Sequence, residues 1–414
     1  MAKFEKANSV GEWLDQRLNL TTFNKVMMTE YWIPKDINFL WAMGVLLATT
    51  FTILVISGLF LMMYYKPDIN LAFDSVNYTI MQEVAFGWLF RHLHGVAASV
   101  IFLIIYIHML TGIYYGSYKQ GREMIWISGM LLFVTFSAAG FSGYMLPWGQ
   151  MSYWAAMVIT NLFGGVPVIG DALVVWIRGD FNVADATLTR FFMLHVFLLP
   201  IAIMGLIGLH FYTLRIPHVN NQSSDEFDFD AEAEKYLSGN KKESKVIPFW
   251  PVFISKDLAV LGVFLIFYFY LVFFHYSFAM DPVNFDPADP MVTPAHIYPE
   301  WYFLWSYEVL RGFFFDIAGI KAFDIGLIAF AFANGIFFVL PWLDRDNKIL
   351  PAHKRPLFFI WFWLLVVDLI VLTVYGKLPP TGTNAWVGFF AAVAFILLFV
   401  LLPVITKLDQ KRRG

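Results

Sequence analysis

The stretch FRHLHGVAASVIFLIIYIH, residues 90–108, contains three histidines and one arginine in a segment that is otherwise apolar. Ionisable side chains are costly inside a bilayer and are usually functional there. An α-helix turns about 100° and rises about 1.5 Å per residue, so His94 and His108 lie within about 40° of one face and about 21 Å apart. His92 lies about 160° around the helix from His108. We therefore expect His92 to be an outer-surface residue and not a member of that pair.

The whole chain is apolar, like this segment. Of 414 residues, 59% are hydrophobic and 14% are charged, whereas soluble domains contain about 25% charged residues. Apolar runs long enough to cross a bilayer recur along the chain. We predict an all-α, polytopic membrane protein with eight transmembrane helices, over residues 37–63, 84–113, 125–147, 188–214, 257–279, 322–343, 357–375 and 386–406.

The basic residues predict the orientation. If the N-terminus is cytoplasmic, 21 of the 28 Lys and Arg residues fall on the cytoplasmic side of these spans, Lys3 and Lys6 included. Lys and Arg are enriched in cytoplasmic loops. We therefore place both termini in the cytoplasm. Three long connections remain: 148–187 and 280–321 on the outer side and a polar linker, 218–256, on the inner side.

The fourth span repeats the histidine pattern of the second. His195 and His210 lie within about 60° of one face and about 22 Å apart. Spans two and four run in the same direction, so His94 meets His195 near the outer side and His108 meets His210 near the inner side. Two such pairs suit two haem irons held between imidazoles. Isolated hydrogen-bonded histidines and a proton path are the alternatives.

Glycines and arginines support the haem interpretation. Gly44 and Gly58 in span one, like Gly129 and Gly143 in span three, are separated by the same 14 residues as the histidines of span two. Small residues let a bulky group approach a helix closely, although they also serve helix packing. Arg91 and Arg190 precede the outer histidines and could pair with haem propionates, or could simply reach the membrane surface. The chain has no cysteine, so a thioether-linked haem is excluded within it.

With these features together, the chain resembles a bacterial form of cytochrome b, a subunit of the respiratory cytochrome bc complex, the quinol–cytochrome c oxidoreductase. The resemblance rests on the four histidines, the paired glycines and the segments GYMLPWGQMSYW (143–154), TLTRFF (187–192), IPFWPVFISKDL (247–258) and PEWYFLWSYEVLR (299–311). It implies a dihaem four-helix bundle over residues 1–217, a linker over 218–256 and a C-terminal four-helix part over 257–414. One departure is the spacing of 15 in span four, where most mitochondrial-type relatives have 14.

The resemblance also implies two quinone sites. At the outer site Glu300 would accept a proton from quinol, Tyr302, Tyr307 and Tyr144 would line the pocket, and Gly143 and Pro147 would shape it. At the inner site Asp257 and Lys256 would supply protons to quinone, with Trp41 beside the ring. The family often has a histidine five residues after the inner ligand. Here that position is Arg215, with His218 three residues further, so Arg215 serves either the quinone or an inner propionate.

The function implied is quinol oxidation at the outer side, electron transfer across the membrane and quinone reduction at the inner side, contributing to a proton gradient. The implied partners are a Rieske iron–sulfur protein, a c-type cytochrome, quinone, the lipid bilayer and a second copy of the complex, with no nucleic acid. The segment VPVIG (166–170) would form part of the dock for the iron–sulfur domain. The rivals are a dihaem anchor that relays electrons to quinone, which usually has fewer spans, and a transporter with histidine proton relays.

Overall fold

The computed structural model describes residues 7–223, 226–278 and 280–413. Lys3, Lys6 and the last residue of the fifth predicted span lie outside these ranges. Eight helical segments are long and apolar enough to span a bilayer, which confirms the predicted polytopic fold. They are Phe39–Met62, Gly87–Tyr114, Glu123–Met145, Asp185–Arg215, Phe249–Phe274, Ala322–Leu343, Pro356–Lys377 and Thr383–Arg413.

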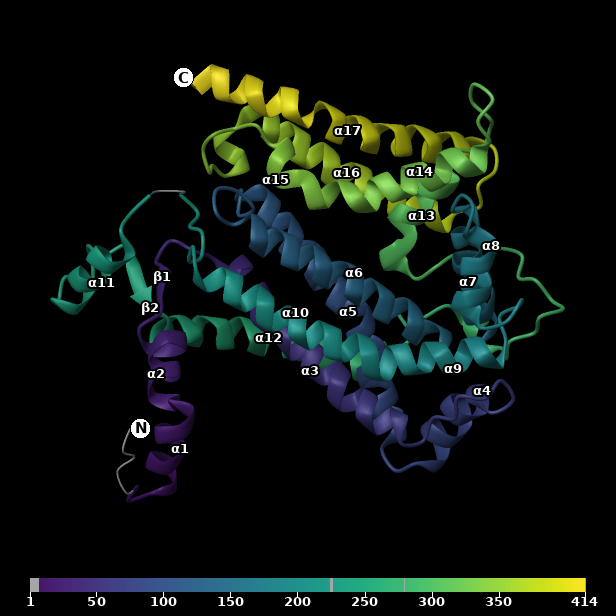
Figure 1. The fold of residues 1–414 in the computed structure, drawn as a ribbon, viewed down its shortest axis with the longest axis horizontal. Coiled ribbons are helices and arrows are strands. Elements are labelled where there is room, and N and C mark those ends of the chain that lie inside the picture. Colours follow the sequence, from purple (N-terminus) through teal and green to yellow (C-terminus); the bar gives the residue numbers. More distant parts are fainter. Residues whose placement is uncertain (1–6, 224–225, 279, 414) are drawn as a thin grey trace.

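The first four spans form a bundle (Figure 1). Its long helices are α3 (Met43–Met62), α5 (Gly87–Tyr114), α6 (Glu123–Met145) and α10 (Leu199–Arg215), the last preceded by α9 (Asp185–Met193) and the π-helical turn η5 (Leu194–Leu198). Helix α3 packs along α5, and α6 packs along α10. These two helix pairs form one bundle. It contains the segments that carry the predicted histidines, which are α5 and the continuous stretch of η5 and α10.

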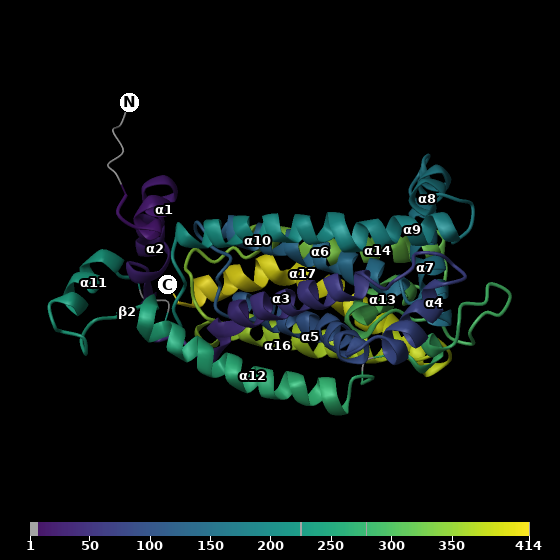
Figure 2. The same ribbon diagram turned by 90° about the horizontal axis from the view of Figure 1, so that it is seen from below.

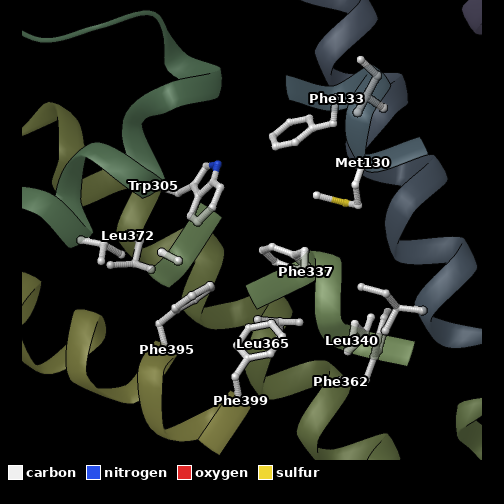
Figure 3. Packing of buried hydrophobic residues seen from close by; sticks show 14 of the residues in the cluster. Met130, Phe133, Trp305, Phe337, Leu340, Phe362, Leu365, Leu372, Phe395 and Phe399 are labelled. Carbon is white, nitrogen blue, oxygen red and sulfur yellow. The ribbon is translucent and has the colours of Figure 1, made fainter. Parts of the chain in front are cut away.

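The remaining long helices divide between two locations. Helix α12 (Ile254–Phe274) packs against α5 and α3 of the first bundle. Helices α13 (Leu304–Arg311), α14 (Ala322–Gly335), α15 (Leu340–Leu343), α16 (Pro356–Lys377) and α17 (Thr383–Arg413) pack together on the other side. A large apolar core joins this group to α6, with Met130 and Phe133 of α6 facing Trp305, Phe337 and Phe395 (Figure 3).

Short elements cover the two ends of the molecule. One end carries α4 (Ala72–Asp74), α7 (Gln150–Leu162) and α8 (Gly170–Arg178); the other carries α1 (Val10–Leu18), α2 (Leu20–Asn24), α11 (Phe229–Leu237) and the last turns of α17 (Figures 1 and 2). Strands β1 (Trp32–Pro34) and β2 (Val246–Pro248) pair antiparallel at the second end. We call the first the outer end and the second the inner end, after the sides predicted from the charges.

A buried ion cluster at the inner end connects the two halves of the chain. Asp344, which follows α15, accepts two hydrogen bonds from Arg355, at 2.8 and 2.7 Å, and one from Tyr118, at 2.6 Å. The Lys119 ammonium lies 3.1 Å from the same carboxylate. Arg355 and Asp344 are almost completely buried. The loop between α5 and α6 is therefore tied to the loop between α15 and α16 by charged groups.

Candidate functional site

The four predicted histidines meet in two pairs. The ring centroids of His94 and His195 lie 6.1 Å apart with planes at 76°, and those of His108 and His210 lie 6.4 Å apart at 71°. A metal with bonds of about 2 Å to one nitrogen of each ring separates the ring centres by about 6 Å. Each pair therefore has a spacing at which its two rings could hold one metal ion between them.

Hydrogen bonds orient three of these rings. The Ser57 hydroxyl donates to the Ile53 carbonyl at 2.6 Å, so its oxygen is left to accept from Nδ1 of His94, 3.0 Å away. Ser128 has the same arrangement, with Nδ1 of His210 at 2.9 Å and the Ile125 carbonyl at 2.9 Å. Nδ1 of His195 donates to the Ala139 carbonyl at 2.9 Å.

These bonds place the proton on Nδ1 and leave the Nε2 lone pair of each ring for a metal. Metal-binding histidines usually have such a partner on the second nitrogen. Among the described residues, no cluster of three or more His, Asp or Glu side chains could hold a metal ion. Each pair therefore suits a metal whose other ligands come from a porphyrin, as in haem.

The predicted glycines lie beside the histidine rings. A Cβ at Gly58 would lie 3.2 Å from Cε1 of His94, and a Cβ at Gly129 would lie 3.3 Å from Cε1 of His210. At Gly143 a Cβ would overlap the His195 ring. A Cβ at Gly44 meets no heavy atom within 4 Å, so this position borders open space. Three of the four glycines thus make room for the ligand rings themselves.

The outer histidine pair opens into a cavity of about 280 Å³. His94 and His195 line it together with residues of the segment that contains PEWY and of the loop before it. The predicted site residues on its wall are Arg91, Gly58, Gly143, Tyr144, Pro147, Glu300 and Tyr302. The outer histidine pair and the expected quinol-binding carboxylate therefore share one continuous space.

Glu300 is the predicted proton acceptor of the outer site and lies on the cavity wall. Burial and, to a smaller extent, the nearby Asp281 carboxylate raise the pKa of Glu300, whereas the Tyr144 hydroxyl and Arg91 partly oppose the shift, and the resulting pKa is about 8. The free site therefore holds Glu300 mainly protonated at neutral pH, close to the point at which it can exchange a proton. Tyr302 is 3% exposed and stacks on Phe102, with ring centroids 3.8 Å apart.

Two predicted outer residues lie off the cavity wall. Tyr307 donates a hydrogen bond to the Ile297 carbonyl at 3.2 Å, and the Arg311 guanidinium lies over its ring at 5.0 Å. Arg190 is exposed and donates to the Trp176 carbonyl. Tyr307 is thus in a position to support the loop before Glu300, and the role of Arg190 stays a prediction.

The expectation for His92 is wrong. Its side chain is 8% exposed and stacks on Tyr276, with ring centroids 3.7 Å apart and planes at 7°. The helix α12 and the residues that follow it cover this side of α5. His92 is therefore a packing residue between helices, separate from the cavity.

The predicted inner residues lie on three elements at the inner end: η2 (Phe39–Ala42), α12 and the last turn of α10. Trp41 donates to the Asn220 carbonyl at 3.0 Å and packs on Tyr115, and its short helix η2 (Phe39–Ala42) contacts α12. Asp257 is half-buried in the first turn of α12, and Lys256 beside it is exposed. Arg215 ends α10, whereas Asp257 lies on α12. The Arg215 guanidinium lies over the Tyr31 ring, 3.7 Å from its centroid.

Sequence reasoning missed three residues of these sites. Ser57 and Ser128 each stand directly before a predicted glycine, and this repeated Ser-Gly dipeptide was a usable signal. Asp281 lines the outer cavity beside Glu300. It lies 19 residues before Glu300 in a loop with several acidic residues, so no local pattern singles it out.

Comparison with known proteins now decides the family. Residues 28–217 match the family described as Cytochrome b/b6/petB, and residues 287–408 match Cytochrome b(C-terminal)/b6/petD. The chain belongs to the cytochrome b family. It is 39% identical over 409 residues to cytochrome b of Rickettsia bellii, covering 99% of this chain and 96% of that protein. It is 38% identical to cytochrome b of Rhodobacter capsulatus, covering 98% and 93%.

A solved structure extends the comparison to the fold. A chain of the structure titled "Hyperthermophilic respiratory Complex III" superposes with a TM-score of 0.87 at 37% identity, covering 97% of this chain and all of that one. The cytochrome b fold thus accounts for all eight spans, and the chain is a multi-pass membrane protein of that family.

Proposed function

We propose that this cytochrome b is the core redox subunit of a quinol–cytochrome c oxidoreductase in the bacterial inner membrane, with both termini cytoplasmic. It oxidises quinol at the outer end, passes electrons across the membrane and reduces quinone at the inner end, contributing to the proton gradient. The observation that carries the proposal is the single cavity shared by the His94–His195 pair and Glu300.

Two b haems belong to the proposal, one at His94 and His195 and one at His108 and His210. When bound, haem supplies one-electron redox chemistry between the two ends of the molecule. The Nδ1 hydrogen bonds of His94, His195 and His210 support this assignment, because they leave Nε2 as the metal-binding nitrogen. Arg91, on the cavity wall, would bind a propionate of the outer haem.

At the outer site the protein handles protons and excludes water. Glu300, once ionised, accepts a proton from the quinol hydroxyl as a general base. Tyr144 forms a hydrogen bond with Glu300 and orients its carboxylate, and Tyr302 closes the cavity wall. A carboxylic acid with a pKa near 8 accepts and returns protons close to neutral pH, which suits repeated turnover.

At the inner site Asp257 and Lys256 would carry protons to quinone, with Trp41 beside the ring. The contact between η2, which contains Trp41, and α12, which begins with these two residues, supports a common site. The domain division also stays a proposal: residues 1–217 bind haem, 218–256 link the halves, and 257–414 complete the outer quinol site.

The proposed partners are a Rieske iron–sulfur protein and a c-type cytochrome, in a complex that contains two copies of this chain. The chain has no cysteine to hold an iron–sulfur cluster or a covalent haem, so other subunits must supply them. Val168 and Ile169, in the predicted docking segment, are exposed at the outer end.

A reduced-minus-oxidised absorbance spectrum of the purified complex tests the proposal. Two b haems per chain and quinol-dependent reduction of a c-type cytochrome are expected. A complex without b haem contradicts the cofactor assignment, and two b haems without quinol oxidation contradict the activity.

A further inference from the structure

Glu308 and Arg311, about one helical turn apart on α13, form an ion pair next to the outer site. Nε of Arg311 donates to Oε2 of Glu308 at 2.5 Å, and the side chains of Arg311 and Glu308 are 13% and 3% exposed. The residues that line the outer cavity include neither of them. Removing two charges from water is costly, so such a pair is weak evidence for stability on its own. Its role follows from the groups that it holds in place.

Glycines of two neighbouring helices make room for α13. Helix α13 packs against α14, α16 and α17 (Figure 1). A Cβ at Gly388 of α17 would overlap the Glu308 carboxylate, and a Cβ at Gly326 of α14 would overlap the Leu310 carbonyl. The neighbouring helices therefore leave α13 little freedom to shift, and Gly388 provides the space that the Glu308 carboxylate occupies.

Arg311 joins α13 to the end of α16. Nη2 of Arg311 donates to the Tyr375 carbonyl and, at 2.7 Å, to the Leu378 carbonyl. Leu378 is the C-cap residue of α16. The last carbonyls of a helix lack partners within the helix, and a cation near them is favourable. Because Glu308 holds the Nε edge of the same guanidinium, the direction of Nη2 is fixed.

The same guanidinium supports the segment that leads to Glu300. It lies over the Tyr307 ring, 5.0 Å from the centroid, which is within the range of a cation–π interaction. The Tyr307 hydroxyl donates at 3.2 Å to the carbonyl of Ile297, three residues before Glu300. Nε2 of His296 donates at 3.0 Å to the carbonyl of Lys377, the last residue of α16. The segment is thus attached to α13 and to α16, and the guanidinium connects these two helices.

We propose that Arg311 is a positioning residue for quinol oxidation. It holds Tyr307, and Tyr307 holds the backbone that leads to Glu300, so the Glu300 carboxyl stays at the cavity. Glu308 orients Arg311 from the space that Gly388 leaves. This inference rests on the proposed function and adds to it. Because Glu308 and Arg311 lie off the cavity wall, they act through the segment before Glu300 and not by contact with quinol.

Steady-state quinol oxidation by the purified complex, expressed per b haem, tests this role. Arg311→Ala should lower kcat about 100-fold, the cost of misplacing a reacting group by about 1 Å. The KM for quinol should stay nearly unchanged, because Arg311 does not line the cavity. Glu308→Ala should also lower kcat. Glu308→Gln should regain most of the rate, because its amide oxygen still accepts from Nε of Arg311.

Gly388→Ala gives an independent test, since the new methyl group displaces the Glu308 carboxylate. It should lower kcat on its own and have little further effect in the Glu308→Ala variant, where the carboxylate is absent. Gly335→Ala is the matched control. A Cβ at Gly335, the last residue of α14, meets no heavy atom within 4 Å, so kcat should not change.

A normal kcat per b haem in Arg311→Ala overturns the proposal, even if less complex assembles, because that pattern indicates a purely structural role. If Gly388→Ala lowers kcat equally with and without Glu308, the role given to Glu308 is wrong. If Arg311→Ala fails to assemble, Arg311→Lys decides, because it keeps the charge beside Glu308 but loses the bonds to α16. A lowered kcat at unchanged KM then supports the proposal, and a normal kcat contradicts it. Failure of the proposed function looks different, since the wild-type complex would then oxidise no quinol.

Discussion

The Ser57 hydroxyl lies 3.0 Å from Nδ1 of His94 and can only accept from it, because its own proton is donated to Ile53. Loss of such a partner typically weakens metal binding 10–100-fold. We expect Ser57→Ala to release the outer haem about 10–100-fold more readily, as measured by haem content after detergent washing. Ser137→Ala is the control, because Ser137 donates to the Phe133 carbonyl of its own helix and does not line the cavity. Equal haem retention in the two variants would contradict this role.

The outer pair predicts opposite outcomes for two neighbouring histidines. His94→Ala removes a ligand and should eliminate the outer haem from the spectrum while the inner haem remains. His92→Ala should keep both haems and lose only the stacking with Tyr276, worth about 0.5–1.5 kcal/mol. Haem spectra together with thermal denaturation separate the two effects. Loss of a haem in His92→Ala would contradict the assignment of His94, and not His92, as the ligand.

Glu300 makes quinol oxidation depend on pH. The pKa of Glu300 is raised to about 8, mainly by burial, so the ionised base becomes available as the pH rises through about 8. The rate of quinol oxidation should therefore increase between about pH 7 and 9. Glu300→Gln should slow the reaction about 10²–10⁴-fold and flatten this part of the profile, while both haems stay bound. A normal rate in this variant would exclude Glu300 as the base.

Asp281 should affect the pH dependence of quinol oxidation through Glu300. Its negative charge disfavours ionisation of Glu300, so Asp281→Asn should lower the pKa of Glu300. The rise in quinol oxidation should then begin at lower pH, with unchanged haem spectra. A profile that stays in place, or moves to higher pH, would show that Asp281 does not act on Glu300 in this way.

The ion cluster at the inner end predicts a loss of stability. Burial raises the pKa of Asp344, but the charges of Arg355 and Lys119 outweigh it, so the pKa of Asp344 is lowered overall. A carboxylate of this kind stabilises the fold above its unfolded pKa and loses that contribution as the pH falls through its folded pKa. Asp344→Asn leaves Arg355 buried without its partner and should cost about 3–5 kcal/mol, measured by denaturant unfolding in detergent. A variant as stable as the wild type would contradict the role given to this cluster.

The spans and the pairing of the four histidines were predictable because both signals are local. Hydropathy over about 20 residues defines a span, and the helical period alone aligns His94 with His108. The position of α12 was not predictable in the same way. It depends on which helix faces meet, and these contacts join residues far apart in the sequence. His92 illustrates this, since the segment that buries it begins more than 150 residues later.

The polar residues at the two ends divide along the same line. Glu300 and Tyr302 belong to a compact motif, and the structure puts both on the cavity wall. Arg122 precedes α6 and Arg215 ends α10, and only the folded chain shows that some of their buried N–H groups have no partner among the described residues. A sequence pattern records which residues are near in the chain, whereas an unsatisfied donor is a property of packing.

Two contacts join the N-terminal and C-terminal parts of the chain. One is the ion pair between Lys119 and Asp344, and the other is the packing of α12 on α3 and α5. Both contacts join residues before the proposed linker, 218–256, to residues after it, so the two proposed parts contact each other directly. The connecting segment raises their local concentration and need not guide their assembly. We therefore expect that two polypeptides, made separately and inserted into the same membrane, associate in this arrangement.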